Sequence, residues 1–171
     1  MRTSLKLAVV ALLAASSARA QSPAPDSLLD RLIGHWVLTG TIAHQQVVHD
    51  VTFAWVLGNE YVEMHEVSRG RTATGAPAYE AIVYLGCDPK THEYSALWLD
   101  NTTYGAFAPA GTGRGMAVAD SIAFVFPYSP TSRFHTTFLY DRASNRWEWH
   151  MDNDDDGVRR PFARVTLTRA G

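Results

Sequence analysis

Hydrophobic and polar residues alternate along most of this chain, in short runs separated by turn residues. Alternation with a period of two is typical of strands that bury one face. Gly58-Asn59 and the acidic segment 154–157 are turn signals of this kind. The pattern predicts strands at residues 36–43, 48–57, 61–68, 78–87, 94–100, 106–113, 121–127, 133–140, 146–152 and 160–169.

A leucine-rich segment, residues 28–33, departs from this alternation and places its apolar residues on one face of a short helix. Asp26 or Ser27 can cap that helix and Gly34 can end it. A twisted antiparallel sheet of so many strands usually closes, because an open sheet leaves two unpaired edges. The sequence therefore predicts an all-β fold, a single antiparallel up-and-down β-barrel of about ten strands with a short N-terminal helix.

The turns also predict which side chains face the lumen. If Gly58-Asn59 is a two-residue hairpin turn, the inner pairs are Trp55 with Val62, Phe53 with Met64, and Val51 with Glu66. A later hairpin centred on Ala143-Ser144 pairs Tyr140 with Trp147, Phe138 with Trp149, and Thr136 with Met151. Glu66 is then the one inward acid, and Glu63 and His65 point outward. A slip of one residue would exchange the two faces.

The first residues have the features of a signal peptide: a basic start, an apolar run at 7–15 too short to span a bilayer, and a small-x-small site ending at Ala20. We expect cleavage after Ala20 and a secreted or periplasmic protein with no membrane span. The expected organisation is a signal peptide at 1–20, a flexible leader at 21–27 and one calycin-like barrel domain at 28–171.

Charge and cysteine content narrow the function classes. The formal net charge is −2, and removal of the basic leader makes the chain more acidic. Without a Lys/Arg run the chain lacks the basic surface that binds phosphate backbones, so no nucleic-acid partner is expected. Cys87 is the only cysteine, which excludes an intrachain disulfide, and its apolar strand favours a small buried hydrophobe over a nucleophile.

No metal site is expected. The acidic run 152–157 matches the first half of an EF-hand loop, but the twelfth position, which should be Glu, is Ala163. His65-Glu66 begins like a zinc-protease motif, yet the residue four beyond His65 is Arg69. His135 and His150 share one hairpin, and two ligands fall short of the usual three protein ligands.

No cofactor is expected either. A haem-binding barrel would need an inward histidine as axial ligand, and the predicted register turns His135 and His150 outward.

The segments at the two ends of the barrel resemble a known superfamily. Leu32-x-Gly34-x-Trp36 followed by a meander and a terminal Arg169 resembles the calycin barrels, which include lipocalins and fatty-acid-binding proteins. The resemblance implies that Trp36 closes the barrel base and that Arg169 packs over its ring. More narrowly, the segments 84–94, 98–100, 156–157, 161–162 and 165–169 are similar to the bacterial domain of unknown function 1579 family. This resemblance implies a fold more than an activity.

A barrel of this size has room for a cavity among its inward aromatic residues. The expected function is therefore non-enzymatic binding of a small, largely apolar ligand, with no catalytic residue. Glu66 either anchors a polar head group or pairs with Arg114 or Arg164. Alternatives are a cyclase, isomerase or hydrolase that uses Glu66, and a protein-binding envelope protein with a filled lumen; the residues favour no particular oligomeric state. The candidate ligand-binding residues are Phe53, Trp55, Met64, Glu66, Trp98, Phe124, Phe138 and Trp149.

Overall fold

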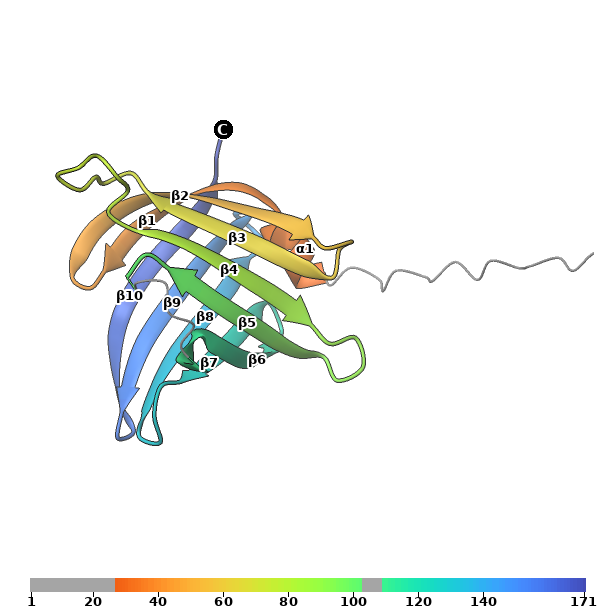
Figure 1. Ribbon diagram of the computed structural model, residues 1–171. Helices are drawn as coiled ribbons and strands as arrows, with labels where there is room; N and C mark the ends of the chain where they lie inside the picture. Colours follow the sequence, from red (N-terminus) through yellow and green to blue (C-terminus); the bar gives the residue numbers. More distant parts are fainter. Residues whose placement is uncertain (1–26, 103–108) are drawn as a thin grey trace, which may run out of the picture.

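A computed structural model describes residues 27–102 and 109–171 as a closed barrel of ten antiparallel strands with a short helix at its N-terminal end (Figure 1). Consecutive strands pair with each other, and β1 closes the barrel against β10. The predicted fold class is therefore confirmed. The elements are α1 (Ser27–Leu32), β1 (Gly34–Ile42), β2 (Gln45–Val56), β3 (Tyr61–Ser68), β4 (Glu80–Cys87), β5 (Glu93–Asp100), η1 (Pro109–Gly111), β6 (Thr112–Val118), β7 (Ser121–Pro127), β8 (Ser132–Asp141), β9 (Arg146–Asp155) and β10 (Val158–Arg169).

Both predicted hairpin registers are confirmed. Trp55 pairs with Val62 and Val51 with Glu66 across β2 and β3, and Phe138 pairs with Trp149 across β8 and β9. The short turns leave little freedom for slippage, and a one-residue slip would turn the aromatic face toward solvent. The inward face of these strands is therefore the one that the sequence predicts.

The sixth strand lies further along the chain than predicted. The sequence predicts it at 106–113, of which 106–108 fall outside the described residues, whereas β6 begins at Thr112. The glycines of this segment are strand positions, because a Cβ at Gly113 would come within 2.7 Å of the Phe126 ring and one at Gly115 would collide with the backbone of β7. Close packing of β7, rather than loop flexibility, explains these glycines.

The first half of the acidic segment 154–157 is strand rather than turn. β9 continues to Asp155, so the predicted end at residue 152 is wrong, and only Asp156 and Gly157 form the turn, both with positive φ. The strand persists because side chains of the neighbouring strands bind its carboxylates. Arg164 and Arg160 form ion pairs with Asp152 at 2.5 Å and Asp155 at 3.4 Å, and Nε2 of His135 lies 3.1 Å from Asp154.

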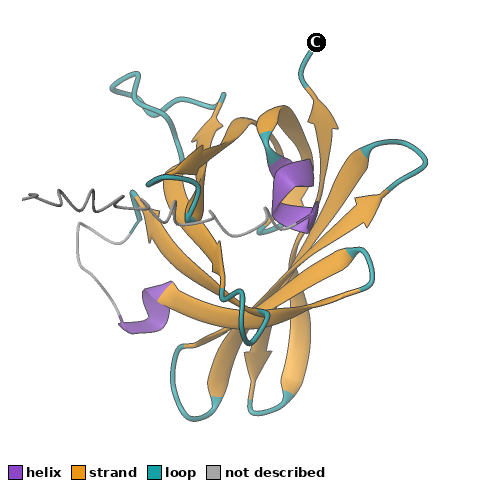
Figure 2. Ribbon diagram, turned by 90° about the vertical axis from the view of Figure 1, so that its right-hand side faces the viewer, coloured by secondary structure: helices purple, strands orange, loops and turns teal. Residues whose placement is uncertain are grey.

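Helix α1 closes one end of the barrel, as Figure 2 shows. Its leucines Leu28, Leu29 and Leu32 are buried in the core. Indole N–H groups of the barrel donate to it: Trp36 to the Leu32 carbonyl at 2.6 Å, Trp55 to the Asp30 carboxylate at 2.9 Å, and Trp147 to the Arg31 carbonyl at 3.4 Å. The bonds from Trp36 and Trp147 satisfy carbonyl groups that a helix end leaves without intrahelical partners. Neither helix in the described residues is long and apolar enough to cross a membrane.

Trp36 and Arg169 lie together at this closed end. The guanidinium carbon of Arg169 is 3.9 Å from the centroid of the Trp36 ring, a cation–π arrangement. The same guanidinium donates to the Ile33 carbonyl at 2.6 Å. Gly34 between them has φ +126°, and a Cβ there would collide with the Arg169 guanidinium. The glycine therefore lets the arginine approach the ring.

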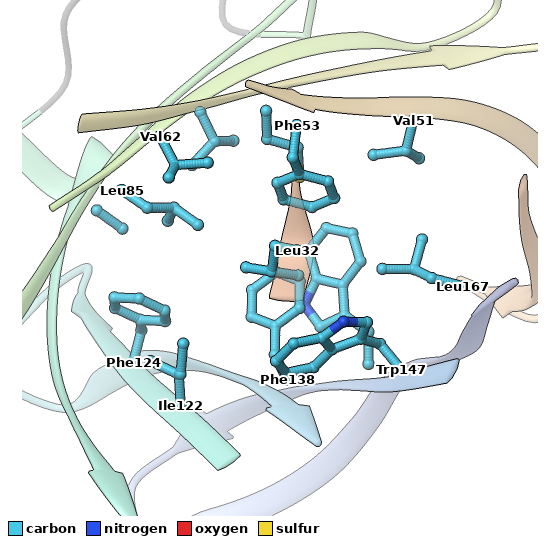
Figure 3. Packing of buried hydrophobic residues seen from close by; sticks show 14 of the residues in the cluster. Leu32, Val51, Phe53, Val62, Leu85, Ile122, Phe124, Phe138, Trp147 and Leu167 are labelled. Carbon is cyan, nitrogen blue, oxygen red and sulfur yellow. The ribbon is translucent and has the colours of Figure 1, made fainter. Parts of the chain in front are cut away.

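Aromatic side chains fill the lumen next to α1 (Figure 3). The rings of Phe138 and Trp149 stack at 4.5 Å, and Trp147 and Phe53 each pack edge-on against Phe138. All four are buried. Cys87 lies half-buried beside this core rather than fully inside it. The cluster of buried hydrophobic residues therefore occupies this half of the barrel interior.

Candidate functional site

The other end of the barrel holds an open cavity of about 850 Å³. Its rim includes Ala43 from the β1–β2 turn, Gly70 from the β3–β4 connection and Tyr128 from the β7–β8 connection, all opposite the end that α1 closes. This volume lies in the range of small-molecule sites. Most of the wall is apolar and includes Ile42, Val47, Trp98, Phe126, Phe134, Met151 and Phe162.

A buried histidine–glutamate pair lies in the cavity wall. His49 on β2 and Glu66 on β3 are only 3% and 1% exposed, and Nδ1 of His49 is 2.5 Å from Oε1 of Glu66. In the ladder His49 faces Ser68 and Glu66 faces Val51, so the pair is diagonal on the inward side. A buried carboxylate without a partner would be costly, and the imidazole supplies that partner.

The His49–Glu66 bond uses Nδ1 of the imidazole and leaves Nε2 for another partner. Because a carboxylate only accepts, the bond assigns a proton to Nδ1 of His49. Within the described part of the chain, Nε2 makes no hydrogen bond. His49 lines the cavity, so this nitrogen is one polar atom of the wall with remaining hydrogen-bonding capacity.

Tyr79 lies beside His49 in the same wall. The two rings stack with centroids 5.9 Å apart and planes 25° from parallel. The Tyr79 hydroxyl accepts a hydrogen bond from the Trp98 indole at 3.1 Å. Burial raises the pKa of Tyr79, and the nearby Glu66 and Asp100 carboxyls raise it further, so the phenol keeps its proton at neutral pH.

The charged groups of the cavity are acidic. Glu66 and Asp100 belong to its lining, and none of the described lining residues is Lys or Arg. Asp100 accepts hydrogen bonds from the backbone and hydroxyl of Thr102, at 2.8 and 2.6 Å. No group of three or more His, Cys, Asp or Glu within the described ranges is close enough to hold a metal ion.

The sequence-predicted site residues separate into three groups. Glu66 and Trp98 line the cavity. Trp55 is half-buried and donates a hydrogen bond to α1. It lies near the end of β2 opposite to the cavity-lining residues 45–49. The remaining residues are buried in the packed core and are Phe53, Met64, Phe124, Phe138 and Trp149. Strand register predicts the side on which a residue lies but not its depth along the barrel axis, so it did not distinguish the filled end from the hollow one.

Both partners predicted for Glu66 are wrong. Arg114 pairs with Glu93, and Arg164 pairs with Asp152. His49 takes their place, and it is an inward histidine that the sequence-based argument against haem overlooked. The confirmed β2–β3 register contains the missed signal, because it puts His49 on the same side as Val51 and Phe53. Tyr79 had no such signal, since it precedes β4 and no short turn sets its register.

Comparisons with known proteins support the fold. No family model and no curated protein matches this chain. The crystal structure of Rv2717c from M. tuberculosis is similar, with a TM-score of 0.55 and 15% sequence identity over 85% of this chain and 99% of that one. At this identity the likeness concerns the barrel alone.

Proposed function

We propose that this protein binds a small, largely apolar molecule in the open cavity of its barrel. The observation that carries the proposal is a cavity of about 850 Å³ with an apolar wall, inside a barrel whose other end holds the cluster of buried hydrophobic residues. Ligand sites in proteins are typically concave and apolar with a few polar groups that fix orientation. His49, Glu66 and Tyr79 are such groups here.

The leader sequence supports a proposed location outside the cytoplasm, and the Trp36–Arg169 contact supports a proposed family. The basic start and small-x-small site at 18–20 support secretion or transfer to a periplasm, which N-terminal sequencing of the protein recovered outside the cytoplasm tests by finding Gln21 first. The Trp36–Arg169 contact supports kinship with calycin barrels. The segments 84–94 and 165–169 support the narrower resemblance to the domain of unknown function 1579 family.

Native mass spectrometry of protein purified without detergent tests ligand binding. The expected spectrum contains a non-covalent adduct whose mass is that of a small lipid-like molecule, which organic extraction releases. A spectrum of bare protein, together with no rise in the emission of the neutral dye Nile red on mixing, would contradict the proposal.

Two tryptophan variants localise the binding. Trp98 lines the cavity whereas Trp55 contacts α1, although both lie on the inward side of their strands. Trp98→Ala should weaken dye binding by about 1–3 kcal/mol through lost apolar contact. Trp55→Ala is the matched control and should leave dye affinity unchanged in the folded protein.

The His49–Glu66 pair favours a second candidate function, an enzyme of the hydrolase or isomerase kind. A carboxylate that holds an imidazole by Nδ1 leaves Nε2 in position to act as a general base. If the extracted ligand is converted on incubation with the protein, Glu66→Gln should slow the conversion by about a hundredfold. A simple binder would show no conversion. The other alternative, a protein-binding envelope protein with a filled lumen, does not agree with the open cavity.

A further inference from the structure

The charges of the cavity lining disfavour the binding of an anion. Its charged lining groups are Glu66 and Asp100, and the described lining contains no Lys or Arg. Both charged lining groups are acids and one imidazole can offset only one of them, so the described lining offers an anion no excess of positive charge. Burial and these two carboxyls raise the pKa of Tyr79, and the same effects oppose a ligand carboxylate.

Two neighbouring groups remain available to a ligand. Nε2 of His49 has no hydrogen-bond partner in the described chain, and the Tyr79 hydroxyl accepts from Trp98 while its own proton has no acceptor there. The stacked rings put both groups in one patch of the wall. Tyr79 offers a donor, and Nε2 offers an acceptor or a donor according to its protonation.

We infer that His49 and Tyr79 form a recognition point for the hydroxyl group of an uncharged apolar alcohol. A hydroxyl both donates and accepts, so it satisfies Tyr79 and either state of Nε2, whereas a carboxylate only accepts and is repelled by Glu66 and Asp100. The hydrocarbon part then lies along the apolar wall that includes Val47, Phe126 and Phe162. This inference rests on the proposed ligand-binding function and names the ligand class for that site.

Competition with Nile red by probes of similar alkyl-chain length tests the inference. At pH 8, 1-decanol should compete at least about tenfold more tightly than decanoate, because of charge, and about fivefold more tightly than decyl methyl ether, which has lost the hydroxyl proton. Decanoate binding as tightly as decanol would overturn the hydroxyl assignment while leaving the binding function intact. Failure of the dye and of every probe to bind would overturn the binding function itself.

Variants separate recognition from folding. His49→Leu alone would leave the Glu66 carboxylate buried and unpaired, so the double variant His49→Leu/Glu66→Leu removes the pair together. It should keep the far-ultraviolet circular dichroism of the barrel and bind decanol and the ether equally. Tyr79→Phe keeps the ring stack and should weaken decanol about fivefold. A full preference for decanol over the ether in the folded double variant, or an unchanged decanol affinity in Tyr79→Phe, would place recognition elsewhere. Trp55→Phe, remote from the cavity, should leave the affinities for all three probes unchanged.

Discussion

The two ends of the lumen are built from the same ten strands by the same alternation, yet one is filled and the other is hollow. At the closed end, α1 inserts its leucines and the large rings of Trp36 and Trp147 meet it. At the open end, the inward positions combine large rings such as Trp98 with smaller or polar side chains such as His49 and Ser68. Alternation therefore defines a lumen, and the helix inserted at one end decides which half is filled.

The polar groups of the two ends differ in how much of their hydrogen-bonding capacity is already used. The indole N–H groups at the closed end donate to α1, so their single hydrogen-bonding capacity is used. At the open end His49 and Tyr79 each have a partner and retain a further capacity that faces the cavity. Fully satisfied groups stabilise a fold, whereas groups with a remaining donor or acceptor in a cavity are those that bind a ligand.

The strongest test of this contrast replaces one tryptophan at each end. Trp36→Ala should lower the free energy of unfolding by about 3–5 kcal/mol, since it empties a packed site and removes the ring beneath Arg169. Trp98→Ala should cost clearly less, about 1–2 kcal/mol, because one side of that ring already faces the cavity. Urea denaturation measures both. Equal losses would mean that the two ends are packed alike.

Enlarging an alanine at each end tests the contrast from the opposite direction. Ala96→Leu inserts bulk into the packed core and should destabilise the protein by about 1–3 kcal/mol. Ala78 belongs to the cavity lining, so a larger side chain there has space. Ala78→Leu should change the free energy of unfolding by no more than about 0.5 kcal/mol. Thermal melts of the two variants compare them. A large loss for Ala78→Leu would show that the open end has no spare volume.

The sequence predicts the fold and the hairpin registers because turn chemistry and period-two alternation are local signals, as Gly58-Asn59 shows. It places Glu66 inside correctly for that reason. It does not predict which inward residues border empty space, since the depth of α1 in the barrel depends on contacts between distant segments such as Trp147 and Arg31. The sixth strand was misplaced because glycines that admit a neighbouring strand resemble loop glycines in sequence.

A smaller effect is expected where α1 is tied to the barrel by one side chain. Trp55→Phe removes the indole donor to Asp30 while keeping an aromatic ring, and it should cost about 1 kcal/mol of stability. Hydrogen exchange of α1 amides should quicken in the variant. Asp30→Asn keeps an acceptor and is the matched control with a smaller effect. Unchanged exchange in Trp55→Phe would indicate that the remaining closed-end contacts hold α1 without this bond.

The smallest expected effect is that of surface aspartate–arginine pairs on the melting temperature, and here the two ends should not differ. Asp50 at the open end and Asp120 at the closed end each pair with an exposed arginine, Arg69 and Arg142, which hold the carboxyl pKa below its ordinary value of 3.8. A carboxyl whose pKa is lowered by folding stabilises the protein above its ordinary pKa and loses that contribution as the pH falls through the lowered value. Asp50→Asn and Asp120→Asn should therefore each give a slightly lower melting temperature than the parent at pH 7, and the difference should vanish well below pH 3.8. Both pairs are on the surface, where screening keeps such effects small. A large loss in one variant alone would show that a surface charge, and not only packing, distinguishes the two ends.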